Sequence, residues 1–183
     1  ITAASFQVSE PGLEYQPSMP AVTGPESLMS LSEYDERGMS RPSDRLHTLL
    51  NLSAPFDLKP VESTAGEAVD PLRQLVWIKT THAIPPDAGL HRAVLAYISD
   101  YGLVTTSLRP HGLNFETPGM QLASIDHGMW FHRPARVDEW LLYACEPLTT
   151  TNSRGLARGS FFARDGTLVA TTVQEGLIRK KGG

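Results

Sequence analysis

The last third of the chain alternates short apolar runs with turn residues, which is the pattern of consecutive strands. Residues 122–179 predict four antiparallel strands, because β-branched and aromatic side chains are enriched in each run. A polar loop at residues 149–153 separates the second strand from the third. The Asp165-Gly166 pair predicts a tight two-residue hairpin between the last two strands, since glycine tolerates the positive φ that such turns need.

Two further strands and one long helix are expected upstream of this region. Residues 56–61 and 74–83 are rich in β-branched and aromatic side chains. A helix is predicted to begin after Asp87, a good N-cap residue, and to end before Gly102, which suits the left-handed position past a helix. Its apolar stripe, at i, i+3, i+4, i+7 and i+8, consists of Leu90, Ala93, Val94, Tyr97 and Ile98. The predicted fold class is therefore α+β, with an antiparallel sheet wrapped around one long helix.

The first third of the chain lacks such periodicity. Residues 10–55 are rich in Pro, Ser, Glu and Gly and predict a linker, with one short helix at residues 26–37. Residues 4–13 partly repeat the sequence of residues 172–177, which indicates that the chain opens on the last strand of an earlier copy of the same domain. The predicted organisation is a terminal strand at 1–9, a linker at 10–55 and one folded domain at 56–183.

Composition narrows the classes of function. The chain has 183 residues and a net charge of −4 without a long basic run, which argues against nucleic-acid binding. No stretch approaches the roughly 18 apolar residues of a membrane helix, so no membrane partner is expected. The single Cys145 excludes an internal disulfide, and its apolar strand predicts a buried small hydrophobe rather than a catalytic thiol. A small molecule or a protein is the expected partner, and the cytoplasm is the expected location, since a lone cysteine fits a reducing compartment.

Asp100 does not fit the helical pattern that precedes it. Helical spacing from Ala93 and Tyr97 places its carboxylate along the edge of the apolar stripe. The residue also lies in the last turn, where the helix dipole disfavours an anion. Two local penalties at one residue favour a functional role. The alternative is a carboxylate that leans into solvent or caps a neighbouring loop.

A serine, an aspartate and a histidine lie close together at residues 124–127. Strand alternation puts Ser124 and Asp126 on one face and His127 on the other, which argues against a Ser-His-Asp triad. His127 and His132 have no evident third ligand and are interpreted as structural, so no metal is predicted.

Gln174 is a polar residue in an apolar row. It falls on the same strand face as Leu168, Ala170 and Ile178, where a buried amide needs partners. The amide could bond neighbouring backbone. Alternatively it could meet Asp100 and Ser124, and these three side chains could then hold and polarise one water molecule for attack on a carbonyl carbon.

Basic side chains near the C-terminus admit two interpretations. They could contact the phosphates of a nucleotide-like substrate, yet most such residues are solvated surface and no glycine-rich phosphate loop accompanies them. The set consists of Arg133, Arg154, Arg158, Arg164, Arg179, Lys180 and Lys181. Gly155 and Gly159 indicate close packing or bulges rather than a cofactor contact, so no cofactor is predicted.

Several motifs together resemble a known family. They are Ser99-Asp100, Arg109-Pro110-His111-Gly112, Ala123-Ser124-Ile125-Asp126-His127, Trp130-Phe131-His132-Arg133-Pro134, Glu139-Trp140-Leu141-Leu142-Tyr143, Arg154-Gly155 and Val173-Gln174-Glu175-Gly176. In this order they closely resemble the C-terminal half of the type II acyl-CoA thioesterases, which have a double-hotdog fold. The segment from Ser5 to Glu14 also looks like the junction that follows the first hotdog of that family.

The resemblance implies an activity and a site. It implies a hotdog domain that hydrolyses fatty acyl-CoA by direct attack of water, activated by Asp100, Ser124 and Gln174. The family is expected to carry threonine at the position of Ser124. Serine keeps the hydroxyl but loses the methyl that stiffens χ1, which allows slower turnover with the same mechanism.

The resemblance also implies a partner for this half. The missing N-terminal hotdog half or a second copy of the chain would complete the acyl tunnel, and a homo-oligomer is expected. The alternatives are a non-catalytic acyl-CoA-binding or structural hotdog module, and a hotdog dehydratase, which would need His127 to face the substrate. Family members also occur in peroxisomes, but the Lys-Lys-Gly-Gly end is not a peroxisomal Ser-Lys-Leu signal.

Overall fold

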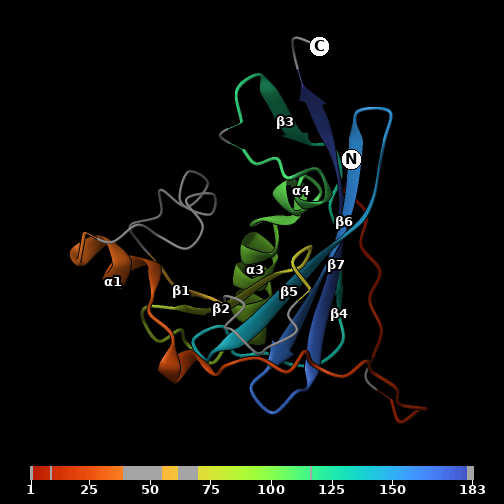
Figure 1. Ribbon diagram of the computed structural model, residues 1–183. Coiled ribbons are helices and arrows are strands. Elements are labelled where there is room, and N and C mark those ends of the chain that lie inside the picture. The colour runs from red at the N-terminus through yellow and green to blue at the C-terminus, as the bar shows by residue number, and fades with distance from the viewer. Residues whose placement is uncertain (1, 9, 39–54, 62–69, 116, 181–183) are drawn as a thin grey trace.

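One antiparallel sheet of seven strands organises the part of the chain that the structure, a computed structural model, describes: residues 2–8, 10–38, 55–61, 70–115 and 117–180. The strand order is β1-β2-β5-β6-β7-β3, and β4 also pairs with β7 (Figure 1). In chain order the strands are β1 (Phe56–Pro60), β2 (Gln74–Thr80), β3 (Met120–Ser124), β4 (Gly128–Phe131), β5 (Leu141–Thr151), β6 (Arg154–Ala163) and β7 (Leu168–Lys180). The two upstream strands predicted from the sequence are confirmed.

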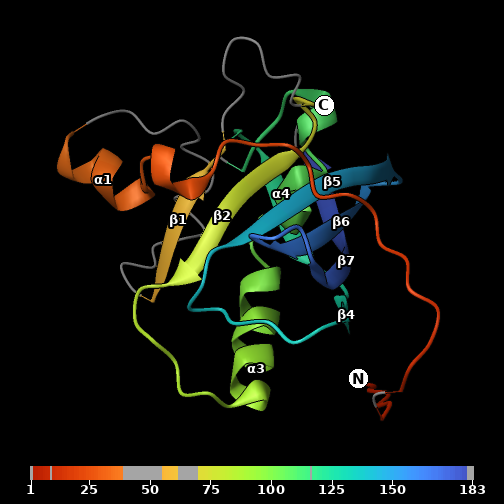
Figure 2. The same ribbon diagram turned by 90° about the horizontal axis from the view of Figure 1, so that it is seen from below.

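The long helix α3 (Ala88–Ser99) lies against the inner face of the sheet, which curves around it (Figures 1 and 2). Asp87 is its N-cap, as predicted, and its Oδ1 atom accepts hydrogen bonds from the amides of Gly89 and Leu90 at 2.7 and 3.1 Å. Leu95 and Ile98 are each 1% exposed and belong to the inner core. The predicted α+β arrangement of a sheet around one helix is confirmed.

The buried face of α3 matches the predicted stripe only in part: Ile98 is buried and Val94 packs against the inner core. His91, Leu95, Ile98 and Ser99 are buried, whereas Leu90 and Tyr97 are 41% and 55% exposed. Tyr97 instead stacks on Phe56 and meets the edge of Tyr101, with ring centroids 6.0 and 5.5 Å apart. The prediction was wrong for Leu90, Ala93 and Tyr97, because helical periodicity fits two neighbouring faces and the helix is turned so that His91, Leu95 and Ser99 meet the sheet.

The first strand predicted in the last third is two strands. β3 ends at Ser124 and β4 begins at Gly128, and the residues between them leave the regular ladder. The amides of Ile125 and Asp126 both donate to the carbonyl of Glu175, while the Asp126 carboxylate accepts from the Glu175 amide at 2.9 Å. A side chain therefore replaces the backbone partner at the break, which alternation alone could not predict.

Both predicted turns differ in length from the structure. β5 continues through Thr151, so the expected loop at 149–153 shrinks to Asn152 and Ser153, which have φ of 50° and 59°. Positive φ at both central residues is the geometry of a two-residue primed turn. The Asp165-Gly166 hairpin is present but longer: Gly166 donates to the Ala163 carbonyl and the Ala163 amide to the Thr167 carbonyl, with φ of 88° at Gly166 alone.

A short helix that the sequence did not indicate follows α3. Gly102 has φ of 80°, as predicted for the position past a helix, and starts α4 (Leu103–Thr106), after which comes the 3₁₀ turn η2 (Arg109–His111). Glycines in the sheet let α4 lie close to it. A Cβ atom at Gly155 would lie 2.5 Å from the Ser107 Cβ, and one at Gly176 would lie 2.7 Å from a Val104 methyl. The close-packing interpretation of Gly155 is confirmed.

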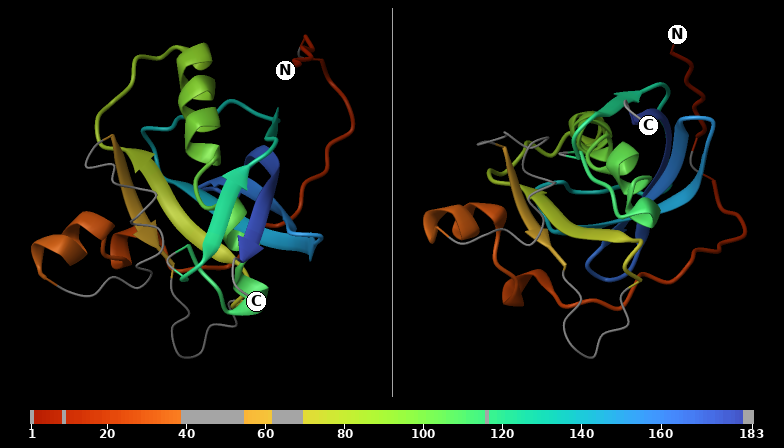
Figure 3. Two further views of the ribbon diagram at one scale, coloured as in Figure 1. Left: turned by 90° about the horizontal axis from the view of Figure 1, so that it is seen from above. Right: turned by 45° about the horizontal axis from the view of Figure 1, so that its top comes forward.

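The N-terminal third has more structure than a linker. The described residues 2–8 form no strand, because a strand needs a hydrogen-bonded neighbour; that they complete a preceding domain stays a prediction. The helix expected at 26–37 is divided into η1 (Pro25–Ser27) and α1 (Leu31–Glu36). Residues 16–28 cross the face of the sheet opposite α3 (Figures 2 and 3), where Met19, Val22 and Leu28 pack against a second apolar cluster. Residues 39–54 of the predicted linker lie outside the described residues.

Candidate functional site

Three polar side chains from distant parts of the sequence meet at one end of α3. The Nε2 atom of Gln174, on β7, lies 2.5 Å from Oδ1 of Asp100 and 3.1 Å from Oγ of Ser124. Gln174 is completely buried, while Asp100 and Ser124 are exposed. The structure thus brings together the three residues that the sequence analysis selected, and Gln174 joins the other two.

Asp100 and Ser124 each lie at the end of an element, and Gln174 of β7 bonds to both. Asp100 is the C-cap of α3, where the chain turns at Gly102 instead of continuing the helix. Ser124 is the last residue of β3 and pairs with Gly176 of β7, which places it beside Gln174 two residues away. The local fold therefore holds a carboxylate and a hydroxyl on either side of a buried amide.

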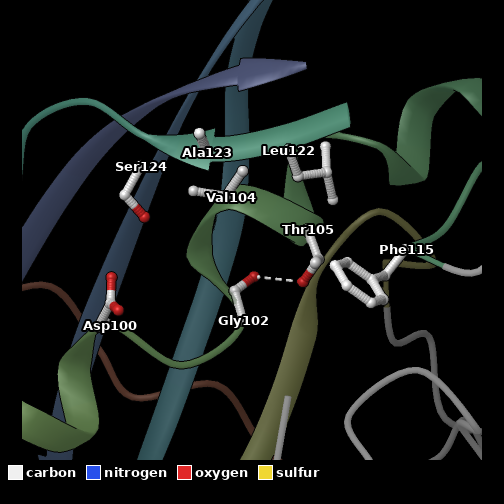
Figure 4. Close-up of a pocket in the computed structure, with 8 residues that line it drawn as sticks. All are labelled: Asp100, Gly102, Val104, Thr105, Phe115, Leu122, Ala123 and Ser124. Atoms are coloured by element: carbon white, nitrogen blue, oxygen red, sulfur yellow. Dashed lines mark hydrogen bonds between the residues drawn. The ribbon is translucent and has the colours of Figure 1, made fainter. Parts of the chain in front are cut away.

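A pocket of about 130 Å³ opens beside this group. Figure 4 shows the Asp100 carboxylate and the Ser124 hydroxyl directed toward each other on one side of the pocket, with Phe115 on the other. The lining residues are Asp100, Gly102, Val104, Thr105, Phe115, Leu122, Ala123 and Ser124. Three side chains in the lining carry oxygen, and the Thr105 hydroxyl donates to the Gly102 carbonyl at 3.0 Å. Asp100 and Ser124 therefore form the polar end of a pocket whose other side chains are apolar.

The apolar part of this lining was not anticipated from the sequence. Val104 and Thr105 belong to α4, which has only four residues and too little periodicity to be recognised. Phe115 lies between elements, where apolar residues carry no pattern. Gly102 was the one available signal, since its left-handed conformation marks the turn that brings α4 to the site.

Hydrogen-bond capacity restricts what Gln174 can do. An amide nitrogen has two hydrogens, and Asp100 and Ser124 account for both. Its Oε1 atom is buried and has no partner among the described residues. The opposite orientation of the amide would set an oxygen against the Asp100 carboxylate, so the observed orientation is the favourable one.

The prediction that His127 faces away from Ser124 is wrong. Its Nε2 atom lies 2.9 Å from the Thr172 hydroxyl, and Thr172 shares a face of β7 with Gln174, the partner of Ser124. Alternation failed because the ladder breaks between Ser124 and Gly128. His127 does not line the pocket, however; its ring is directed at Ser99 and Thr172.

The two histidines considered as metal ligands are separated by the sheet. His132 bonds to the Thr171 hydroxyl at 2.9 Å, and Thr171 faces away from Thr172, the partner of His127. Burial, with a smaller effect of Arg133, lowers the pKa of His132. Within the described ranges there is no group of three His, Cys, Asp or Glu residues placed to hold a metal ion. No helix in those ranges is long and apolar enough to cross a membrane.

Burial accounts for Cys145, and ion pairs account for four of the basic side chains. Cys145 is completely buried, and burial raises the pKa of its thiol to about 12. Four of the basic side chains pair with carboxylates of the same chain: Arg133 with Glu14, Arg154 with Glu175, Arg158 with Glu146, and Arg164 with Glu26. These pairs agree with the surface interpretation for those four arginines. Lys181 lies outside the described residues.

Comparisons with known proteins identify a family for the chain. A family model described as acyl-CoA thioesterase matches residues 50–177. The chain is 38% identical to acyl-CoA thioesterase 2 of Haemophilus influenzae and to acyl-coenzyme A thioesterase 8 of Mus musculus, over 96% and 99% of its length. It spans only 62% and 59% of those relatives.

Solved structures give the fold. The chain superposes on acyl-CoA thioesterase II of Mycobacterium marinum with a TM-score of 0.74 and 32% identity, covering 97% of this chain and 61% of that one. A hotdog-fold protein of Alicyclobacillus acidocaldarius has a TM-score of 0.65 at 15% identity, covering 95% of this chain and 59% of that one. The sheet and its enclosed helix are therefore a hotdog fold, and the chain belongs to the acyl-CoA thioesterase family.

Proposed function

We propose that the protein hydrolyses the thioester of acyl-CoA by direct attack of a water molecule held beside Asp100 and Ser124. The observation that carries the proposal is the hydrogen-bonded chain from Asp100 through Gln174 to Ser124 on the wall of a mostly apolar pocket. Family membership supports the same chemistry, because the relatives from Haemophilus influenzae and Mycobacterium marinum are named acyl-CoA thioesterases.

The hydrogen-bonding capacity of each group suggests its role. Both amide hydrogens of Gln174 are engaged, so Gln174 orients Asp100 and Ser124 and does not itself donate to the water. Ser124 accepts from Gln174 and keeps its own hydroxyl hydrogen, which it donates to the water oxygen. The Oδ2 atom of Asp100 accepts one hydrogen of the water. This refines the expectation that all three side chains contact the water.

The reaction then needs one proton acceptor and an oxyanion site. Asp100 takes a proton as the water oxygen attacks the thioester carbonyl carbon, and a tetrahedral intermediate forms. The C–S bond breaks, the CoA sulfur receives that proton, and the free acid is released without an acyl-enzyme. The oxyanion of this intermediate needs hydrogen-bond donors beside the attacked carbonyl group.

The substrate chain is proposed to extend beyond this unit. A pocket of about 130 Å³ is small beside the roughly 300–1,000 Å³ of typical ligand sites. The chain also spans only about three fifths of its curated relatives, at 62% and 59%. A preceding hotdog half or a second copy would supply the other walls of an acyl tunnel. With a second copy, the assembly is a homo-oligomer.

The alternatives have less support. A dehydratase would direct a histidine at the substrate, but the Nε2 atom of His127 is occupied by Ser99 and Thr172 and the residue does not line the pocket. A non-catalytic acyl-CoA-binding module gives no reason for a buried glutamine to orient a carboxylate and a hydroxyl.

Release of free thiol from palmitoyl-CoA by the intact protein tests the proposal. Asp100→Asn and Gln174→Ala are each expected to lower kcat by about 10²–10⁴, because the proton acceptor or its orientation is lost. Asp126→Asn is the matched control, since that carboxylate accepts from the Glu175 amide and not from the site. Wild-type rates in both site variants would refute the water site, and binding without any wild-type turnover would favour the module.

A further inference from the structure

A second polar cluster lies directly behind the proposed water site. The Nε2 atom of His127 is 3.0 Å from the Ser99 hydroxyl and 2.9 Å from the Thr172 hydroxyl. Both hydroxyl-bearing residues are completely buried. Ser99 immediately precedes Asp100, and Thr172 lies two residues before Gln174 on the same face of β7. The cluster therefore connects the two segments that carry the carboxylate and the amide.

The hydrogens of this cluster can be assigned from its contacts. The Ser99 hydroxyl donates to the carbonyl of Ala96 at 2.7 Å, and the Thr172 hydroxyl donates to the carbonyl of Gly128 at 2.9 Å. Each hydroxyl has one hydrogen, and a carbonyl has none to give. Both hydroxyls must therefore accept at His127, so its Nε2 atom carries a hydrogen that is shared between them.

Ser99 is also held through its backbone. The Tyr143 hydroxyl donates to the Ser99 carbonyl at 2.6 Å. Tyr143 is 1% exposed and its ring stacks on Phe161 with centroids 3.9 Å apart. Burial raises the pKa of Tyr143 well above its ordinary value, so the hydroxyl stays protonated and can donate. A Cβ at Gly159 would lie 2.4 Å from this ring, which explains glycine at that position.

We propose that His127 is a positioning residue, protonated on Nε2, which together with Tyr143 clamps Ser99 to the sheet and so sets the Asp100 carboxylate against Gln174. The expected effect on turnover rests on the proposed function. The tautomer of His127 follows from its hydrogen bonds and does not. The physical basis of the positioning role is that Asp100 is the C-cap that directly follows Ser99, the last residue of α3, so no further turn of that helix restrains it. A displacement of about 1 Å at a reacting group can cost about 10²-fold in rate.

Kinetics of histidine variants test the clamp. His127→Ala is expected to lower kcat for palmitoyl-CoA by about 10- to 100-fold with little change in KM, because the carboxylate is misplaced while the pocket is retained. His127→Gln places an amide N–H near the former Nε2 atom and is expected to recover most of the loss. His132→Gln is the matched control, since His132 bonds to Thr171 on the opposite face of β7.

The outcomes separate the clamp from the proposed function. Activity in His127→Ala equal to wild type, with Asp100→Asn inactive, would overturn the clamp and leave the thioesterase site in place. An equal loss in His127→Ala and His127→Gln would also overturn it. An inactive wild type would instead reject the proposed function.

A spectroscopic measurement tests the tautomer independently of activity. Nitrogen chemical shifts of the ¹⁵N-histidine-labelled intact protein are expected to identify His127 as protonated on Nε2. In Thr172→Val the Ser99 hydroxyl alone is left to accept the hydrogen on Nε2, so a shift of that resonance is expected. A neutral His127 protonated on Nδ1 would overturn the inference even in an active enzyme.

Discussion

At position 124 the chain carries a hydroxyl group without the methyl of threonine. The Ser124 hydroxyl accepts from Gln174 at 3.1 Å and, in the proposed mechanism, donates to the attacking water. Either hydroxyl amino acid can do both, whereas alanine can do neither. The methyl group contributes only by restricting χ1.

Substitutions at Ser124 should separate the hydroxyl from the methyl. Ser124→Ala is expected to lower kcat by about 10²-fold, as for removal of one preorganised donor. Ser124→Thr is expected to keep wild-type turnover or exceed it a few-fold, because the hydroxyl is retained and its rotamer is restricted. The kinetics of thiol release by both variants would measure the two effects on turnover. Equal activity of the alanine variant and wild type would exclude a role for the hydroxyl.

At the scale of elements, the site depends on how closely α4 approaches the sheet. Val104 and Thr105 of α4 line the pocket, and Gly155 and Gly176 provide the surfaces on which the α4 region rests. The Asp100 end of α3 and the start of α4 are separated by a single left-handed turn at Gly102. A change in α4 packing should therefore displace Asp100, the proposed proton acceptor.

Adding a methyl group under α4 should damage both stability and turnover. Gly155→Ala and Gly176→Ala are each expected to lower the free energy of unfolding by about 1–3 kcal/mol, because the new Cβ would overlap Ser107 or Val104. Gly12→Ala is the control, since no atom lies within 4 Å of a Cβ placed there. Denaturant titration and kcat would be measured together. An unchanged free energy of unfolding in both Gly155→Ala and Gly176→Ala would show that α4 can shift to accommodate the added methyl group.

At the scale of the whole molecule, the N-terminal segment is part of the folded unit. The side chain of Gln16 donates to the Gly166 carbonyl and accepts from the Leu168 amide, and the Trp77 indole donates to the Thr23 carbonyl at 2.9 Å. Arg164 and Glu26 form a two-point ion pair. These contacts hold residues 16–28 across the outer face of the sheet.

Disrupting this contact should destabilise the domain. Met19→Asp places a charge against the outer apolar cluster and is expected to cost about 2–3 kcal/mol of unfolding free energy and to expose residues 16–28 to protease. Leu13→Asp is the control, because Leu13 is fully exposed, at 107% of its reference area. Thermal unfolding and limited proteolysis of the intact protein would be compared. Equal behaviour of the two variants would contradict a packed segment.

The sequence by itself determined the long helix, most of the strands and the identity of three polar residues in the candidate site. Periodicity located α3, its Asp87 cap and the central strands, since these features follow from local side-chain preferences. Asp100 and Gln174 were recognisable because each is a polar residue placed where burial or a helix end makes it costly. Ser124 was noticed for its position near Asp126 and His127, and the motifs around all three resemble a thioesterase family.

Only the tertiary structure decided how these pieces meet. The break after Ser124 depends on Asp126 binding the Glu175 amide, a contact between residues 49 positions apart, so strand alternation gave the wrong side for His127. The buried face of α3, the place of α4 and the packing of residues 16–28 likewise depend on the space that the curved sheet leaves. Local patterns specify which groups are costly to bury, but only long-range contacts determine which partner each group finds.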